Sequence, residues 1–438
     1  VVDKSKLNFI MGNPPFVGKK EQTKEQRNDL IDLFGKKAKG VGNLDYVCGW
    51  YKKAAGMIQG TSIQCAFVST NSITQGEQAP VLWKLLDEDN ININFAYRTF
   101  RWDSEASLKA HVHCVIIGFS FISVAEKKLF LNEGQTVVVS HINPYLVDAP
   151  TAYIESRSKP ISDAPEIVYG SMPIDDGHLI LEKEDVDAIL AENPDNALMI
   201  RKYVGGAELL RNRDRWCLWL KEVSPADIKK SNIVMDRVKK TADFRKSSNR
   251  PQTLALAETP TLFGEIRQPE TSMLAIPKVS SENRRYIPIC YVSPEIIVNG
   301  SALIIPGASM YHFGILTSNV HNAWMRTVAG RMKSDYQYSG KIVYNNFPWP
   351  EPTEEQKAKI EATAQAILDA RARYPDSSLA DLYDELTMPP ELRTAHQKND
   401  RAVWEAYGKA WDITSESDCV AALMKRYQAL AAASAISC

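Results

Sequence analysis

Several common patterns are missing from this sequence of 438 residues. Its seven cysteines are an odd number, lie far apart and form no Cys-x-x-Cys pair, which argues against a disulfide framework and against a zinc site. No apolar run approaches the roughly 18 residues of a membrane span, and the first residues do not have the pattern of a signal peptide. We therefore expect a cytoplasmic protein with reduced thiols, no metal and no membrane partner.

An excess of charge of one sign is also missing, because the net charge of the chain is −1. The charge is unevenly distributed, however. Residues 201–250 contain 14 Lys and Arg against 6 Asp and Glu, whereas residues 351–400 contain 6 against 11. A basic middle and an acidic end fit a phosphate-facing domain followed by a solvated helical domain. A solvated basic face is the alternative.

The most informative stretch is at residues 7–16, Leu-Asn-Phe-Ile-Met-Gly-Asn-Pro-Pro-Phe. The apolar run Phe9–Met11 predicts a strand that is buried on both faces of a parallel sheet. Gly12 lets the chain turn, and Pro14 and Pro15 prevent a helix from starting at once. The sequence therefore predicts a stiff corner at the carboxyl end of a strand, where open α/β sheets bind their ligands.

This corner has the groups needed to hold an amine. The Asn13 amide oxygen and the Pro14 carbonyl are two acceptors at a fixed separation, which can bind both protons of one amino group. The nitrogen lone pair then points outward, toward an electrophile. Phe16 offers a face on which a planar ring can stack. The pattern predicts a site that methylates the exocyclic amine of a nucleobase, although Asn-Pro can also simply start a turn.

The corner resembles motif IV of the amino-methyltransferases that modify adenine N6 or cytosine N4 in DNA. Further stretches resemble a narrower family, the single-chain MmeI-like Type IIG/IIL restriction–modification enzymes. They are Phe100-Arg101-Trp102 with Ala110-His111-Val112-His113, Pro277-Lys278-Val279-Ser280-Ser281-Glu282, Tyr344-Asn345-Asn346-Phe347-Pro348-Trp349-Pro350, and Leu386-Thr387-Met388-Pro389-Pro390-Glu391-Leu392.

The resemblance implies an adenine-N6 methyltransferase that uses S-adenosylmethionine and acts on double-stranded DNA. The adenine would be flipped out of the duplex, with Asn13, Pro14, Pro15 and Phe16 forming the catalytic corner. Phe100 or Trp102, in a predicted link over 100–107, would supply a second wall for the base. Methyl transfer requires no metal, whereas a nuclease domain of this family would require magnesium.

The glycine-rich loop that holds the cofactor in these enzymes precedes the corner, and no Gly-x-Gly follows a strand pattern in this sequence. We therefore expect a carboxy-terminal fragment of a longer enzyme, without a nuclease domain, that binds S-adenosylmethionine weakly or not at all. Its cofactor contacts are unknown, with Asn13 as one candidate.

The fold class we expect is α/β: a partial Rossmann-like class I methyltransferase sheet, a mixed α/β target-recognition domain and a small helical C-terminal domain. The boundaries predicted are 1–142, 143–345 and 346–438. In the first segment, strands over 65–68, 91–97 and 113–119 alternate with helices over 44–59 and 81–86. In the last, a capping box at Thr353 and Gln356 starts one helix, Pro389 and Pro390 start another that runs to Tyr407, and 420–431 supplies a further one. We expect these helices to pack in one small bundle.

Basic side chains next to polar and aromatic ones are the candidates for DNA contact. A Lys-rich stretch over 17–43, with loop character, lies next to the corner. The candidates are Lys19, Lys20, Arg211, Arg213, Arg245, Arg250, Arg331 and Lys333.

Glu282 and Arg284 form a further candidate pair. They lie two residues apart in a polar turn between predicted strands over 274–279 and 286–291, so their side chains face the same side. A carboxylate accepts from cytosine N4 and a guanidinium binds guanine O6 and N7, so the pair suits the reading of one base pair. An exposed salt bridge of little consequence is the alternative.

Two other functions remain open. One is a methyltransferase for another amine, such as cytosine N4, RNA or a protein glutamine. The other is a non-catalytic DNA-binding module. The sequence gives no oligomeric state and no recognised DNA sequence.

Overall fold

The computed structural model describes residues 3–103, 111–131, 134–408 and 415–436. The described chain divides into two compact units. Unit 1 combines residues 1–163, 323–350 and 411–438, and unit 2 combines residues 164–322 and 351–410. Helix α10 (Asn319–Val328) begins in unit 2 and continues in unit 1. No helix in the described ranges is both long and apolar enough to cross a membrane.

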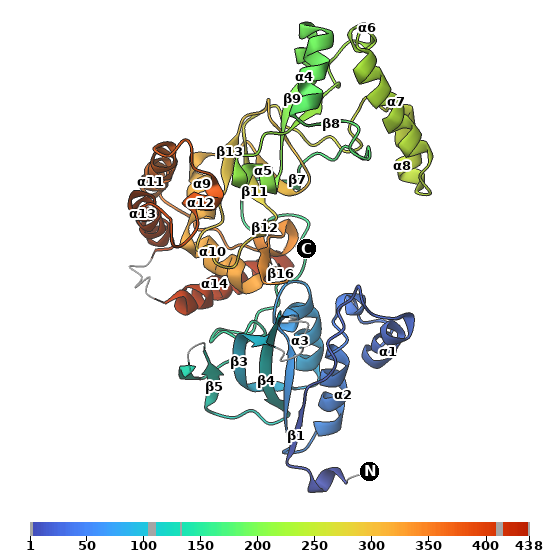
Figure 1. Ribbon diagram of the computed structural model, residues 1–438. Coiled ribbons are helices and arrows are strands. Elements are labelled where there is room, and N and C mark those ends of the chain that lie inside the picture. The colour runs from blue at the N-terminus through green and yellow to red at the C-terminus, as the bar shows by residue number, and fades with distance from the viewer. Residues whose placement is uncertain (1–2, 104–110, 132–133, 409–414, 437–438) are drawn as a thin grey trace. The chain divides into compact units, whose positions relative to one another are not determined.

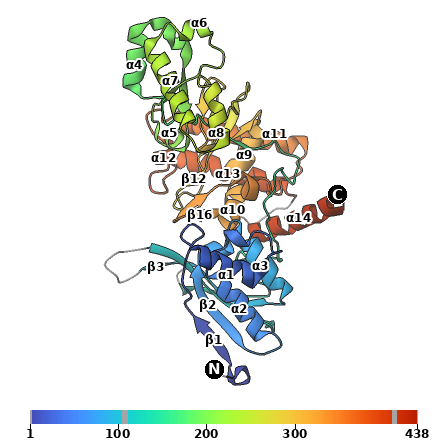
Figure 2. The ribbon, with the colours of Figure 1, turned by 90° about the vertical axis from the view of Figure 1, so that its right-hand side faces the viewer.

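Unit 1 is built on one mixed sheet with helices packed against it (Figures 1 and 2). The strands of this sheet are β1 (Phe9–Gly12), β2 (Gln64–Thr70), β3 (Asn92–Asp103), β4 (His111–Ser120), β5 (Lys127–Phe130) and β6 (Thr136–Val139). Unit 1 also contains the hairpin of β16 (Gly330–Met332) and β17 (Asp335–Gln337). Its helices are η1 (Lys4–Lys6), α1 (Lys24–Phe34), η2 (Val41–Asn43), α2 (Cys48–Ile58), η3 (Asn71–Thr74), α3 (Gln78–Glu88), the π-helix η7 (Gly340–Tyr344) and α14 (Glu416–Ile436).

The described sheet of unit 1 has the order β1-β2-β4-β3-β5-β6. Strand β1 runs parallel to β2, β4 runs antiparallel to both β2 and β3, and β3 runs parallel to β5. The predicted α/β class is confirmed, and the antiparallel β4 lies inside the sheet, between β2 and β3. Because β1, β2 and β3 point the same way, their carboxyl ends lie along the same edge of the sheet.

Aromatic side chains hold α2 and α3 onto the sheet. Tyr51 of α2 is fully buried and stacks on Phe119 of β4, with ring centroids 5.1 Å apart. It also meets Phe67 of β2 and Trp83 of α3 edge to face. This cluster packs next to the carboxyl end of β2, where the Tyr51 hydroxyl is 2.7 Å from the Ser69 hydroxyl. The strands that carry the candidate site therefore rest on a packed core.

The prediction that Phe9–Met11 is buried on both faces is wrong. The strand forms as predicted, but Phe9 is 65% exposed and Met11 is 79% exposed. Within the described sheet β1 is an edge strand with β2 as its neighbour, so its side chains lack the covering that a central strand has.

Two further expectations for unit 1 are corrected. The stretch 17–43 contains helix α1, because Thr23 and Gln26 form a capping box and Leu30 and Phe34 are buried on one face. Phe100 and Trp102 lie in β3, which continues to Asp103 across a register shift after Tyr97, and do not form a link between strands. Residues 104–110, the rest of the predicted link and Ala110 of the quoted motif, lie outside the described residues.

Unit 2 contains two small sheets and a group of helices. Its strands are β7 (Val168–Tyr169), β8 (Ile180–Leu181), β9 (Ile200–Val204), β10 (Trp216–Leu218), β11 (Met273–Pro277), β12 (Val279–Ser280), β13 (Cys290–Val292), β14 (Ile297–Val298) and β15 (Ala302–Pro306). Its helices are α4 (Lys183–Glu192), η5 (Pro194–Met199), α5 (Gly206–Arg211), α6 (Pro225–Ile228), α7 (Asn232–Lys246), α8 (Pro251–Ala255), η6 (Leu256–Glu258), α9 (Met310–Thr317), α11 (Glu354–Ala372), α12 (Leu379–Leu382) and α13 (Pro390–Ala406).

The two sheets of unit 2 have the orders β14-β9-β10-β8 and β13-β11-β15-β7. The first covers an apolar core that it shares with α4 and α7, with Leu179, Ile189 and Cys217 fully buried. The second has its own cluster around Met273, Ala275 and Ile304. A mixed α/β region is therefore present after the methyltransferase-like sheet, as predicted.

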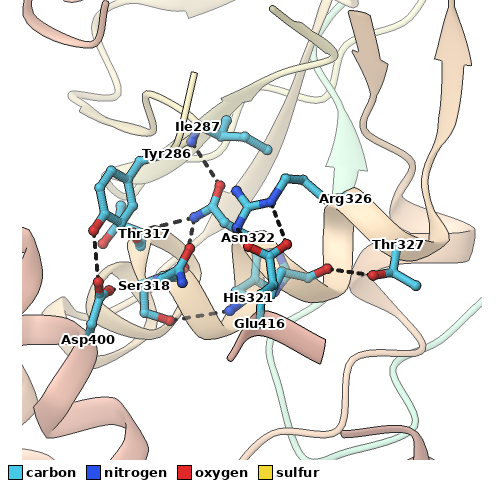
Figure 3. A network of polar contacts seen from close by, with 12 residues as sticks. Tyr286, Ile287, Thr317, Ser318, His321, Asn322, Arg326, Thr327, Asp400 and Glu416 are labelled. Atoms are coloured by element: carbon cyan, nitrogen blue, oxygen red, sulfur yellow. Dashed lines mark hydrogen bonds and ion pairs between the residues drawn. The ribbon is translucent and has the colours of Figure 1, made fainter. Parts of the chain in front are cut away.

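A strand over 286–291 is not formed as predicted, since β13 begins only at Cys290. The Ile287 N–H donates to the Asn322 amide oxygen at 2.9 Å, and the Tyr286 hydroxyl donates to Asp400 at 2.8 Å (Figure 3). The Asn322 side chain thereby occupies the Ile287 backbone N–H, which would otherwise be available to a strand ladder.

Helices α11 and α13 begin where predicted, whereas α14 begins at Glu416 rather than at 420, and these helices do not form one bundle. Helix α11 has the Thr353–Gln356 capping box, and α13 ends before Gly408, whose φ is +79°. Both pack with α9, where Gly314 leaves room for Ile360 of α11. Helix α14 belongs to unit 1, because Arg426 donates to the Trp349 carbonyl and Gln428 to the Thr151 carbonyl.

Candidate functional site

The Asn13–Phe16 corner directly follows β1, at the carboxyl ends of the parallel strands. Asn13 is exposed, Pro14 is buried and Phe16 is half-buried. The Asn13 amide forms no hydrogen bond with the part of the chain that the structure describes. An exposed amide on a stretch of backbone fixed by a buried proline is suited to bind an external polar group.

A buried carboxylate holds the chain immediately after this corner. Asp45 is 4% exposed, and its Oδ1 accepts from the N–H groups of Val17 and Val47, each at 3.2 Å. The Thr70 hydroxyl, at the end of β2, donates to Asp45 Oδ2 at 3.2 Å. Asp45 thereby ties the residue after Phe16 to the carboxyl end of the neighbouring strand.

Gln22 supports the same turn from the other side. Its side chain is buried, and its Nε2 donates to the carbonyls of Val17 at 3.1 Å and Leu44 at 2.9 Å. The Tyr46 N–H donates to the Val17 carbonyl as well, at 3.0 Å. Both backbone groups of Val17 are therefore fixed, and the position of the corner is determined from its carboxyl side.

Burial raises the pKa of Asp45, and the hydrogen bonds from Val47, Thr70 and Val17 oppose this rise. Sequence reasoning missed Asp45 and Gln22. An acidic residue just before the apolar helix pattern at 47–58 is a recognisable helix-start signal, and it could have pointed to Asp45. Nothing in the pattern around Gln22 distinguishes it from other polar loop residues.

Phe100 and Trp102 lie at the same edge of the sheet as the corner. Phe100 pairs with Cys114 of β4, which pairs in turn with Thr70 at the end of β2. Trp102 is 44% exposed, and its ring centroid is 6.1 Å from that of Phe100. An aromatic surface is therefore available at the carboxyl ends of these strands.

The basic candidates differ in exposure. Six are exposed on the described surface: Lys19, Lys20, Arg211, Arg213, Arg250 and Lys333. Lys333 is at the tip of the β16–β17 hairpin with φ +57°. Arg331 is half-buried, with its guanidinium 4.2 Å from the centroid of the Tyr336 ring. Glu282 and Arg284 are half-buried in the turn between β12 and β13.

The prediction that Arg245 contacts DNA is wrong. Its side chain is fully buried, and its five N–H groups donate to five backbone carbonyls. The acceptors are Pro173, Ile174, Leu256, Thr259 and Leu262, at 2.8–2.9 Å. A guanidinium with every donor used inside the protein has none left for a phosphate or a base.

A sheet of this topology, with an Asn-Pro-Pro-Phe corner at the carboxyl end of a strand, defines a class I methyltransferase-type fold. Comparison with known families is consistent with that class. The profile described as the MmeI DNA-methyltransferase domain matches residues 2–131, that of the MmeI target recognition domain matches 148–351, and that of the MmeI C-terminal domain matches 352–434. The chain belongs to the MmeI family.

Two relatives show how far the similarity extends. DNA methyltransferase A of Bacillus subtilis (strain 168) is 38% identical over 421 residues, which are 96% of this chain and 47% of that protein. The Type IIL restriction–modification enzyme MmeI, solved in complex with DNA, is 45% identical with a TM-score of 0.88, over 98% of this chain and 58% of that one. The chain thus spans about half the length of the relatives it matches.

Proposed function

We propose that this protein methylates adenine N6 in a specific DNA sequence with S-adenosylmethionine, as part of a single-chain restriction–modification enzyme of the cytoplasm. The observation that carries the proposal is the Asn13–Phe16 corner, fixed by Asp45 in a chain that carries the MmeI methyltransferase and target recognition domains. The proposed division of labour follows the predicted segments: catalysis in 1–142, recognition in 143–345 and a helical domain in 346–438.

The corner positions the amine that is methylated. Asn13 Oδ1 and the Pro14 carbonyl accept the two protons of the adenine amino group and direct its lone pair outward. S-adenosylmethionine supplies the electrophilic methyl group. Asn13 is the residue that we name as a cofactor contact, because its exposed amide is unused within the described chain. In-line attack then depends mainly on how well the two reactants are held.

A flipped base needs two walls. Phe16, half-buried next to the corner, stacks on one face of the adenine. Phe100 or Trp102 supplies the other wall, and both are at the edge where the parallel strands end. The exposed cations Lys19, Lys20, Arg211, Arg213, Arg250 and Lys333, together with Arg331, contact the DNA backbone in this proposal. The DNA complex of the relative MmeI supports a duplex as the partner.

A methylation assay with defined duplexes tests this function. The intact enzyme should transfer labelled methyl groups to DNA, and nuclease digestion should release N6-methyladenine. Asn13→Ala should lower the rate of transfer by about 100-fold or more, because an interaction completed as the nitrogen attacks is lost. Specific DNA binding should remain, since Asn13 contacts no part of the DNA other than the target base in this proposal.

Other products would identify the alternatives. N4-methylcytosine, methylated RNA or methylated protein would assign a different amine. Binding of DNA without any transfer would indicate a non-catalytic module. Normal turnover by Asn13→Ala would show that the corner is only a turn.

We propose in addition that Glu282 and Arg284 read one base pair. They lie two residues apart in the β12–β13 turn, and a carboxylate and a guanidinium suit cytosine and guanine edges. The double charge reversal Glu282→Lys with Arg284→Asp should change the preferred base at one position and preserve methyl transfer. Sequencing of the methylated sites decides this, and an unchanged site with normal activity would exclude the pair from recognition.

A further inference from the structure

Unit 1 contains a cavity of about 490 Å³ that the proposed reaction does not use. Its lining includes Arg98, Arg326, Arg331, Glu416, Gln75 and Tyr336. The volume is many times the roughly 30 Å³ that one water molecule occupies in the liquid. The cavity therefore has room for a polar group with a substituent attached.

Among the residues that the structure describes, three guanidinium groups and one carboxylate line this cavity. The carboxylate of Glu416 is paired with Arg326, whose Nε and Nη2 donate to the two carboxylate oxygens at 2.8 Å each (Figure 3). Arg331 stacks on Tyr336 and donates from Nη1 to the Ser334 carbonyl at 2.7 Å. The described lining therefore carries a formal charge of +2.

Arg98 is the most informative of the three. It is half-buried at the cavity, and its guanidinium makes no hydrogen bond to any residue in the described ranges. Burial lowers the pKa of its guanidinium, and Glu416 opposes this effect. A desolvated cation with unused donors is costly, and an anion in the cavity would relieve that cost.

Gln75 adds a second unused polar group. It is 8% exposed, and its amide oxygen has no hydrogen-bond partner in the part of the chain that the structure describes. The oxygen and nitrogen of such an amide are interchangeable by rotation, so the group can accept or donate. A buried amide of this kind can donate to the acceptor oxygens of a ligand, hydroxyl and ether oxygens included.

The cavity lies on the edge of the sheet that carries the catalytic corner. Arg98 and Thr99 are near the carboxyl end of β3, and Thr74 and Gln75 follow the carboxyl end of β2. Those strands point in the same direction as β1, which ends at Asn13. The β16–β17 hairpin continues the positive charge outward from Arg331 to the exposed Lys333 at its tip.

We propose that this cavity binds a phosphodiester of the DNA strand that carries the target base, with Arg98 and Arg331 as ligands and Glu416 as the counter-ion of Arg326. The proposal rests on the proposed function, since it assigns a subsite to the same substrate. A polymeric phosphate backbone is favoured over a free anion because the cationic groups extend from the cavity to Lys333.

A scan with neutral phosphates tests the contact directly. Single methylphosphonates are placed one at a time around the target adenine, and binding is measured for the wild type and for Arg98→Ala. We expect one position at which the wild type loses affinity and Arg98→Ala loses no more. If no position couples to Arg98, the proposal is overturned.

Salt dependence supplies a second measurement. Loss of one phosphate contact should make the slope of log K against log salt shallower by about 0.9 for Arg98→Ala and for Arg331→Ala. Lys53→Ala is the matched control, because Lys53 is exposed on α2 and does not line the cavity. Slopes for both arginine variants equal to that of the control would contradict the proposal.

Glu416→Gln distinguishes a ligand site from a purely structural ion network. The neutral side chain no longer competes for the cations, so DNA should bind more tightly, and methyl transfer should continue. Weaker binding with a lowered melting temperature would show that the network only holds α14.

Failure of this proposal is separable from failure of the proposed function. If the intact wild-type enzyme neither binds nor methylates DNA, the function itself is wrong. If the wild type methylates DNA while the arginine variants match Lys53→Ala, only the phosphate subsite is wrong.

Discussion

Arg245 and Asp45 are two buried charged residues that hold neighbouring backbone segments in place, the first as a hydrogen-bond donor and the second as an acceptor. Arg245, in unit 2, donates to five carbonyls from the segments 173–174 and 256–262. Asp45, in unit 1, accepts from two backbone N–H groups and from the Thr70 hydroxyl. Arg245 holds loops together by donating to their carbonyl groups, and Asp45 holds a turn by accepting from its backbone N–H groups.

The two sites differ in what they support. The loops around Arg245 belong to the region matched by the target recognition profile, and all five guanidinium donors are used internally. The turn around Asp45 carries Val17, the residue after the corner that we propose to be catalytic. Loss of Arg245 should therefore destabilise the fold of unit 2, whereas loss of Asp45 should mainly displace Phe16 and Asn13.

The largest effect should come from Arg245→Met. Removing the guanidinium leaves five carbonyls without their partner in a buried site, a change that typically costs about 3–5 kcal/mol. Thermal unfolding of unit 2 should then occur about 10 °C lower. Lys246→Met is the matched control, because Lys246 is the next residue and is exposed. Equal melting temperatures for the two variants would show that Arg245 does not hold these loops.

Asp45→Ala should come next. Without its acceptors the Val17 and Val47 N–H groups are no longer fixed, and a displacement of about 1 Å at the corner can lower the rate about 100-fold. Methyl transfer should fall by that order while the affinity for DNA changes little. Asp45→Asn keeps an amide oxygen for the same N–H groups and should restore most of the rate. If Ala and Asn variants were equally slow, the carboxylate would have a role other than positioning.

Phe16→Ala should have a smaller effect, confined to the target base. One lost stacking contact is worth about 1–3 kcal/mol. Affinity should fall for a duplex that contains the target adenine and stay unchanged for a duplex with an abasic site there. Phe16→Tyr, which keeps the ring, serves as the control. Equal losses on both duplexes would place Phe16 outside the base pocket.

The smallest effect concerns pH. Because the folded pKa of Asp45 lies above its ordinary value of 3.8, the folded state holds this proton more tightly than the unfolded state does. Proton binding at Asp45 therefore stabilises the folded state below the unfolded pKa, and this stabilisation is lost as pH rises through the folded pKa. The melting temperature of the wild type relative to Asp45→Asn should therefore decrease over that interval and then stay level. A difference that widened in the opposite direction would contradict the sign of the pKa shift.

Local patterns in the sequence identified the strands β1 to β4 and the helices α2, α3 and α14 of unit 1, whereas β5, β6, β16 and β17 were not predicted. Strands over 64–70 and 111–120 and helices over 48–58 and 78–88 are within a few residues of the predictions, because their apolar spacing is regular. The helix over 24–34 was missed, because most of its side chains are polar and its buried face consists of Leu30 and Phe34. The capping box at its start was not recognised either. Phe9 and Met11 were assigned to a buried strand, because an apolar run does not indicate whether a strand is central or at an edge.

The family and the chemistry proposed for the corner could both be inferred from the sequence alone, because Asn13-Pro14-Pro15-Phe16 and the longer motifs are contiguous along the chain. Only the tertiary structure separated Arg245, buried among carbonyls, from cations such as Arg250 that remain exposed. It also brought Asp45 to Val17 across 28 positions and Arg326 to Glu416 across 90. The physical reason is that the role of a charge depends on which donors and acceptors surround it, and those come from segments far apart in the sequence.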